Sequence, residues 1–79
     1  MLALKETIKA VSKAKKVTQL EMAEILGISK QNFSNKVQRN TFSPDELAKI
    51  AEGIGMELVL IDKNAEVKNG DKYVIDPLN

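Results

Sequence analysis

Residues 30 to 37 carry side chains that match the chemistry of DNA base edges. Only Phe33 and Val37 in this segment are large and apolar, and they stand four residues apart, so a helix here buries one face and exposes a polar one. The polar members are Lys30, Gln31, Asn32, Ser34, Asn35 and Lys36. Gln and Asn match the N6 and N7 groups of adenine, Lys reaches guanine O6 or N7, and Ser serves base or phosphate. The segment fits a major groove, and the simpler alternative is an ordinary solvated helix surface.

A preceding short helix would have to position that segment. Met22, Ala23 and Leu26 share one side of a helix with 3.6 residues per turn. Thr18 is expected to cap this helix, and Glu21, three residues on, would complete a capping box. The spacing therefore predicts an amphipathic helix that ends near residue 26.

The turn between the two helices is short and has a defined chemistry. Gly27 can adopt the left-handed conformation that closes a helix, and Ile28 beyond it can fold back onto the core. The Ser29 hydroxyl can accept a backbone N–H of the following turn, so a second helix is expected over residues 30 to 37. Residues 38 to 41 are then expected to form a polar loop, with Phe42 returning to the core.

The stretch from residue 18 to 37 resembles the Cro and phage-repressor family, also called the Xre-type helix-turn-helix. The matching residues are Thr18, Gln19, Glu21, Met22, Ala23, Leu26, Gly27, Ile28 and Ser29. In that family the second helix of the motif lies in the major groove and the first crosses the DNA backbone. The resemblance implies base readout by Lys30, Gln31, Ser34 and Asn35.

The same resemblance implies a set of contacts to the DNA backbone. Gln19 matches the family's phosphate-contacting glutamine, which acts together with the N–H groups of a helix start. The other backbone candidates are Asn32, Lys36, Arg39, Asn40 and Thr41. Lys36 stands where several relatives have an apolar residue, so the core-facing register rests on Phe33 and Val37. Leu20 and Ile25 are extra apolar residues, expected either at an interface or under the C-terminal segment.

Two more helices are expected around the motif. The last one begins with strong start signals: Ser43 as cap, Pro44 at the first helical position and Glu46 completing a capping box. Gly53 and Gly55 are expected to end it. The first helix is expected from about residue 2 to 15. Its stripe holds Leu4, Ile8, Ala10, Val11 and Ala14, and the buried face of the last helix holds Leu47, Ile50, Ala51 and Ile54.

The C-terminal segment changes to the period of a strand. Residues 56 to 61 predict a strand that is apolar on both faces except at Glu57. Asn69 and Gly70 form a hairpin signal between residues 66 to 68 and 72 to 75, in which Tyr73 and Ile75 share a face. The expected fold class is mainly α, a lambda-repressor-like four-helix domain followed by a small antiparallel β ribbon. We divide the chain into a helix-turn-helix domain, residues 1–54, and a β extension of the same structural unit, residues 55–79.

Composition excludes several classes of function. The chain has 79 residues with no cysteine and no histidine, so thiol chemistry, disulfides and the usual general base are absent, and an enzyme is not expected. No cofactor and no metal site is expected. No apolar run approaches the length of a membrane span, so a cytoplasmic protein without membrane contact is predicted.

Charge is distributed unevenly along the chain. Residues 1 to 42 hold eight basic and three acidic residues, a net charge of +5, and the rest holds four basic and eight acidic residues, a net charge of −4. This asymmetry fits a DNA-facing half backed by an acidic one, although solvated lysines on amphipathic helices would also produce it.

The sequence therefore predicts a sequence-specific DNA-binding transcriptional regulator of repressor type. Its partners would be double-stranded DNA and a second copy of the chain, because a single small domain makes few phosphate contacts. Two alternatives stay open: a protein-interaction module on a helix-turn-helix scaffold, and an antitoxin that binds both a toxin and its operator. The C-terminal ribbon could pack on its own helices or pair with a second chain.

Overall fold

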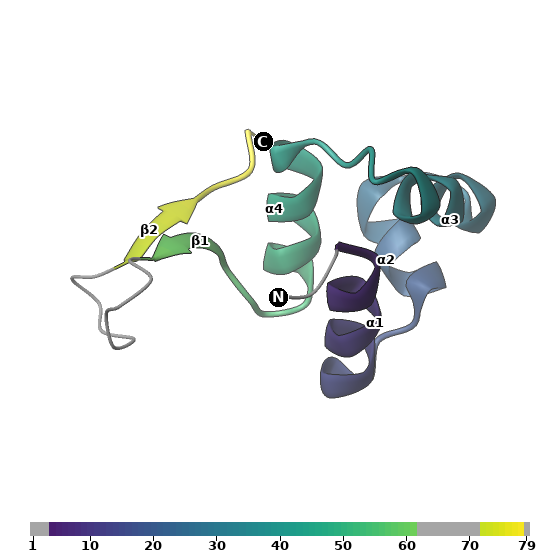
Figure 1. The fold of residues 1–79 in the computed structure, drawn as a ribbon, viewed down its shortest axis with the longest axis horizontal. Helices are drawn as coiled ribbons and strands as arrows, with labels where there is room; N and C mark the ends of the chain where they lie inside the picture. Colours follow the sequence, from purple (N-terminus) through teal and green to yellow (C-terminus); the bar gives the residue numbers. More distant parts are fainter. Residues whose placement is uncertain (1–3, 62–71, 79) are drawn as a thin grey trace.

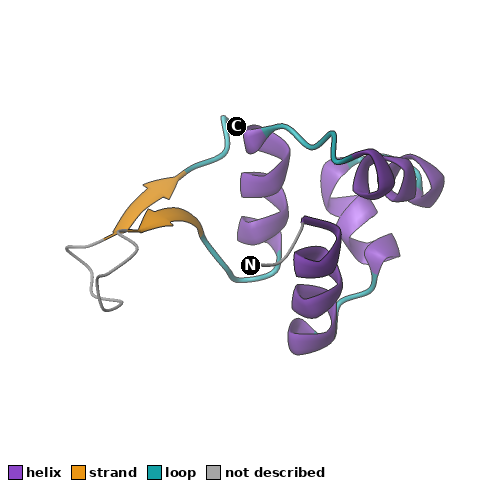
Figure 2. Ribbon diagram, viewed as in Figure 1, coloured by secondary structure: helices purple, strands orange, loops and turns teal. Residues whose placement is uncertain are grey.

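The computed structural model describes residues 4–61 and 72–78, which form four helices and a two-stranded sheet (Figure 1). The helices are α1 (Leu4–Lys15), α2 (Gln19–Leu26), α3 (Lys30–Arg39) and α4 (Pro44–Gly53), and the strands are β1 (Leu58–Ile61) and β2 (Lys72–Ile75). Figure 2 shows the helices gathered on one side and the ribbon projecting from them. The predicted mainly helical fold with a C-terminal β ribbon is confirmed. The described helices include none that is both long and apolar enough to cross a membrane.

Side-chain caps begin three of the helices, as the sequence predicts. The backbone N–H of Glu21 donates to Thr18 Oγ1 at 3.1 Å, that of Asn32 to Ser29 Oγ at 3.0 Å, and that of Glu46 to Ser43 Oγ at 3.1 Å. The capping boxes at α2 and α4 are both complete. Since each cap satisfies an otherwise orphaned donor, these residues fix where the helices start.

Left-handed residues close α2, α3 and α4. Gly27 has φ +71°, Asn40 +56° and Gly55 +77°. After each one, a backbone N–H turns back to a carbonyl five residues earlier, as in the bond of 3.1 Å from Ile28 to Ala23. A methyl group on Gly27 would meet no other atom within 4 Å, so its backbone conformation, and not lack of space, calls for glycine there.

The prediction for the end of α3 was wrong by two residues. Residues 38 and 39 are helical, not part of a polar loop, because nothing in them breaks a helix and Asn40 supplies the left-handed turn. The extra half-turn makes Gln38 and Arg39 part of the exposed surface of α3.

The core lies where α1, α2, α3 and α4 meet. Phe33 and Met22 are fully buried at its centre, and the Phe42 ring packs on Phe33 with a centroid distance of 5.3 Å, which confirms the predicted return of Phe42 to the core. Ala10 and Ala14 were expected in the apolar stripe of α1 but are exposed, because the stripe is only as wide as Leu4, Ile8 and Val11. Residue 2, the expected start of that helix, lies outside the described residues. The buried cluster comprises Ile8, Met22, Ala23, Phe33, Val37 and Ile50.

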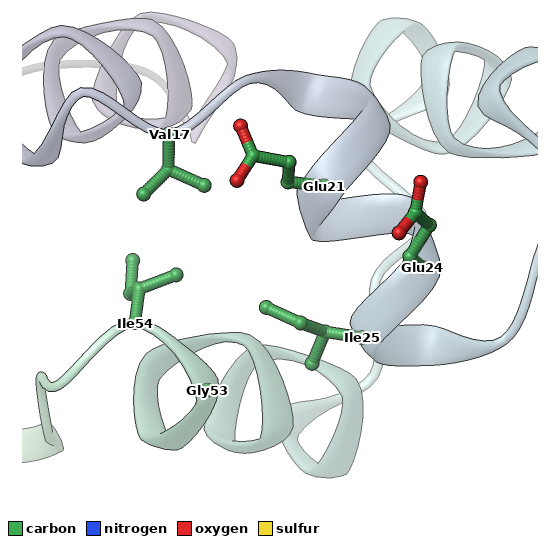
Figure 3. Close-up of a pocket in the computed structure, with 6 residues that line it drawn as sticks. All are labelled: Val17, Glu21, Glu24, Ile25, Gly53 and Ile54. Atoms are coloured by element: carbon green, nitrogen blue, oxygen red, sulfur yellow. The ribbon is translucent and has the colours of Figure 1, made fainter.

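The seam between α2 and α4 includes one close approach. A methyl group on Gly53 would lie 2.7 Å from Ile25 Cδ1, so the missing side chain of Gly53 lets Ile25 rest on α4. Figure 3 shows Ile25 facing Ile54 and Val17 across a cleft of about 420 Å³, with Glu21 and Glu24 along α2. Of the two extra apolar residues of α2, Ile25 packs on α4 and Leu20 is 47% exposed.

The ribbon is an antiparallel pair of strands with little cover. Leu58 lies opposite Ile75 and Leu60 opposite Tyr73. Leu60 is 65% exposed and Tyr73 72% exposed, so the described chain leaves both side chains largely in solvent. The predicted strand 56–61 is confirmed in its last four residues, and residues 72–75 do form a strand. The predicted turn at residues 69 and 70 and the strand at 66–68 lie outside the described residues.

Candidate nucleic-acid interface

The outer face of α3 carries the predicted base-reading residues. Phe33 and Val37 are buried, and this fixes which side of α3 points to the core. Gln31 and Asn35 fall on the opposite side by helix spacing, and Lys30 and Ser34 flank the buried side. Lys30 and Gln31 are exposed, whereas Ser34 and Asn35 are half-buried. All four predicted readers are therefore on one short helix, with the first two the more accessible.

Two of these readers are already joined to each other. Gln31 Nε2 donates a hydrogen bond to Asn35 Oδ1 at 3.2 Å, across one turn of α3. The bond holds both amides on one side of the helix and leaves the Gln31 carbonyl oxygen and the Asn35 amino group without a partner among the described residues. An acceptor and a donor side by side are what the N6 and N7 edge of adenine requires.

The predicted backbone contacts lie at the start of α2 and at both ends of α3. Gln19 is the first residue of α2, directly after the Thr18 cap, and is half-buried. At the other end of the motif, Arg39 closes the last turn of α3, and Asn40 and Thr41 follow it; all three are exposed. Asn32, in the first turn of α3, is exposed as well. These positions frame the outer face of α3 on two sides.

Lys36, another predicted backbone contact, is held by α4. Its Nζ lies 3.1 Å from Glu46 Oε2, and Glu46 Oε1 accepts the backbone N–H of Ser43 at 2.8 Å. The Ser43 N–H, followed by Lys36, lowers the pKa of Glu46. One carboxylate thus caps α4 and ties it to α3, and Lys36 would have to leave Glu46 to reach a phosphate.

One neighbour of this face was not predicted. Lys5, in the first turn of α1, places its Nζ 3.5 Å from Gln38 Oε1 in the last turn of α3. Lys5 carried no predicted role on DNA, because no pattern along α1 reveals which end of α3 it meets. Gln38 was not predicted as part of this surface either, because residue 38 was expected in a loop and not in α3.

Two helices joined by a capped, glycine-centred turn, with a polar outer face on the second, define a helix-turn-helix domain. The model of the bacteriophage CI repressor helix-turn-helix domain matches residues 6–62, more than half of the chain. The chain belongs to this family. The matched range begins within α1, includes β1 and ends before β2. No curated protein and no solved structure matches the chain significantly.

Proposed function

We propose that this protein is a sequence-specific DNA-binding transcriptional regulator of repressor type, which reads the major groove with α3. The observation that carries the proposal is the pair of Gln31, which is exposed, and Asn35, which is half-buried, hydrogen-bonded to each other on the outer face of α3 in a CI-type domain. Preorganised amides lose less freedom on binding a base than free ones would. Such a regulator would act in the cytoplasm, where its DNA lies.

Each predicted contact residue has a role in this proposal. Base contacts come from α3, and phosphate contacts at its flanks set the orientation of the domain on the duplex. The base-reading residues are Lys30, Gln31, Ser34 and Asn35. The phosphate-contacting residues are Gln19, Asn32, Arg39, Asn40 and Thr41, with Lys36 if it leaves Glu46.

A selection from random duplexes tests the proposal. The full chain should enrich a defined sequence at low salt, and its affinity for that duplex should fall with salt at a log–log slope of about −0.9 per phosphate contact. A selection that enriches no sequence would count against specific readout, and absence of binding to every duplex at low salt would refute the function.

We also propose that the regulator is a homodimer joined through the ribbon. Among the residues described from 56 to 61 and from 72 to 78, six large apolar side chains are exposed, and a two-stranded ribbon of this size is marginal without further cover. The outer edge of β1 reads Leu-Val-Leu-Ile, so two copies related by a two-fold axis would meet there without like charges. The six residues are Met56, Leu60, Ile61, Tyr73, Val74 and Leu78.

Sedimentation of the full chain tests the dimer. The wild-type protein should sediment as a dimer at micromolar concentration, and Leu60→Lys should shift it to a monomer with unchanged helical content. Only monomer with and without DNA would contradict the dimer. The same ribbon could instead serve a different protein, as in the antitoxin alternative, and a wild-type monomer that binds DNA would direct attention to that partner.

A further inference from the structure

We propose that Lys5, in the first turn of α1, is a phosphate contact of the DNA interface. The inference rests on the proposed DNA-binding function and adds a third element to it. Lys5 Nζ lies 3.5 Å from Gln38 Oε1, so an exposed ammonium group stands beside the last turn of the helix that reads the bases. The two residues are 33 positions apart in sequence and meet because α1 packs on α3.

The charges around the end of α3 favour Lys5 for this role. Lys36 is neutralised by Glu46, whereas no carboxylate within residues 4–61 and 72–78 forms an ion pair with Lys5. The only hydrogen bond of its ammonium group to the described residues is to the neutral Gln38 amide. A phosphate that approached Arg39 and Asn40 would therefore meet Lys5 without first breaking an ion pair.

The position of α1 restricts the proposed phosphate contact to the first turn of α1. Its first turn meets α3 through Lys5. Lys15, in its last turn, lies near the residue that follows the end of α4, since its Nζ would lie 3.9 Å from a methyl group on Gly55. Lys15 carries the same charge on the same helix and is exposed, like Lys5. The two lysines therefore form a matched pair, one beside α3 and one directed away from it.

The test measures the affinity of Lys5→Gln, Lys5→Arg and Lys15→Gln for the duplex that wild type selects, from 50 to 200 mM salt. Loss of one phosphate contact should weaken Lys5→Gln about 8-fold per domain at 0.1 M salt and make the log–log slope shallower by about 0.9. Lys5→Arg should restore both values, and Lys15→Gln should behave like wild type. The preferred sequence should not change in any of them, because phosphates carry no base identity.

Two results would overturn the inference, and they are distinguishable. If Lys5→Gln and Lys15→Gln keep the same affinity and the same salt slope, Lys5 makes no phosphate contact while the DNA-binding function stands. If wild type binds no duplex at low salt, the proposed function itself fails and the inference fails with it. Thermal unfolding of each variant confirms that the exposed substitutions leave the fold intact.

Discussion

The helical unit and the ribbon differ in how completely their own chain stabilises them. Three helices begin at side-chain caps and are followed by left-handed residues, and their apolar faces meet in one buried cluster around Phe33 and Met22. The described part of the ribbon consists of four residue pairs, and its Leu60 and Tyr73 are largely exposed. The helical unit is therefore self-sufficient, while the ribbon has apolar surface left over for a partner.

This difference matches the two tasks in the proposed function. A base-reading helix must be rigid, and α3 is fixed by Phe33 in the core and by the ion pair of Lys36 with Glu46. A dimer interface must instead leave apolar surface exposed in the single chain. Substitutions in each region test this contrast. The expected loss in the free energy of unfolding is largest in the core and smaller toward the surface.

The largest loss is expected in the core. Phe33→Ala should lower the free energy of unfolding by about 3–5 kcal/mol, because it removes a fully buried ring and leaves a cavity. Tyr73→Ala in the ribbon should change it by less than about 0.5 kcal/mol in dilute protein, since that ring is 72% exposed. Urea unfolding followed by circular dichroism measures both. If the two variants lost comparable free energy of unfolding, the ribbon would contribute as much to the stability of the single chain as the core does.

The seam between α2 and α4 should give the next largest effect. Gly53→Ala should lower the free energy of unfolding by up to about 2 kcal/mol, because the new methyl group would lie 2.7 Å from Ile25 Cδ1 and would push Ile25 aside, against the roughly 1 kcal/mol that alanine gains over glycine in a helix. Ile25→Ala removes the atoms that clash, so the double variant should lose less than the sum of the two single losses. A double-mutant cycle by urea unfolding measures this coupling. If the two single losses in stability simply added in the double variant, the methyl group at residue 53 would not clash with Ile25.

A smaller effect is expected at the cap of α2. Thr18→Ala should cost about 1 kcal/mol, because the Glu21 backbone N–H loses its acceptor and the capping box opens. Thr18→Ser keeps the hydroxyl and should remain near wild type. Thermal unfolding distinguishes the two variants. If both lose the same stability, the methyl group matters and the hydroxyl does not.

The smallest effect concerns pH and the link between α3 and α4. The folded pKa of Glu46 lies below its ordinary value of 4.5, so its contribution to stability is present above that pH and is lost as pH falls through the folded pKa. Glu46→Gln should therefore lower stability at neutral pH and weaken the acid dependence below pH 4.5. Unfolding curves from pH 7 to pH 3 measure it. An unchanged acid dependence would show that the Glu46 carboxylate, through its bonds to Ser43 and Lys36, contributes little to stability.

Features set by neighbouring residues were predictable from the sequence. The caps at Thr18, Ser29 and Ser43 and the left-handed Gly27 depend on side chains within a few positions, and each is where the sequence places it. The end of α3 was misplaced because Asn40, not glycine, takes the left-handed turn, and asparagine is a weaker signal.

Features that depend on distant residues could not be predicted. Lys36 pairs with Glu46 across two helices, and Lys5 meets Gln38 over 33 positions, so neither contact has a local pattern. The amide pair of Gln31 and Asn35 is intermediate. Their spacing of one helical turn can be seen in the sequence, but the hydrogen bond between them can be seen only in the structure. The roles of these residues on DNA remain predictions.

The most direct test of the central claim compares wild type with Gln31→Ala on a panel of single-base variants of the selected duplex. We predict that the wild-type protein discriminates at every position of the half-site, and that Gln31→Ala loses discrimination at one position, by about 1–3 kcal/mol, while keeping the others. An unchanged base preference in Gln31→Ala would contradict readout by the outer face of α3.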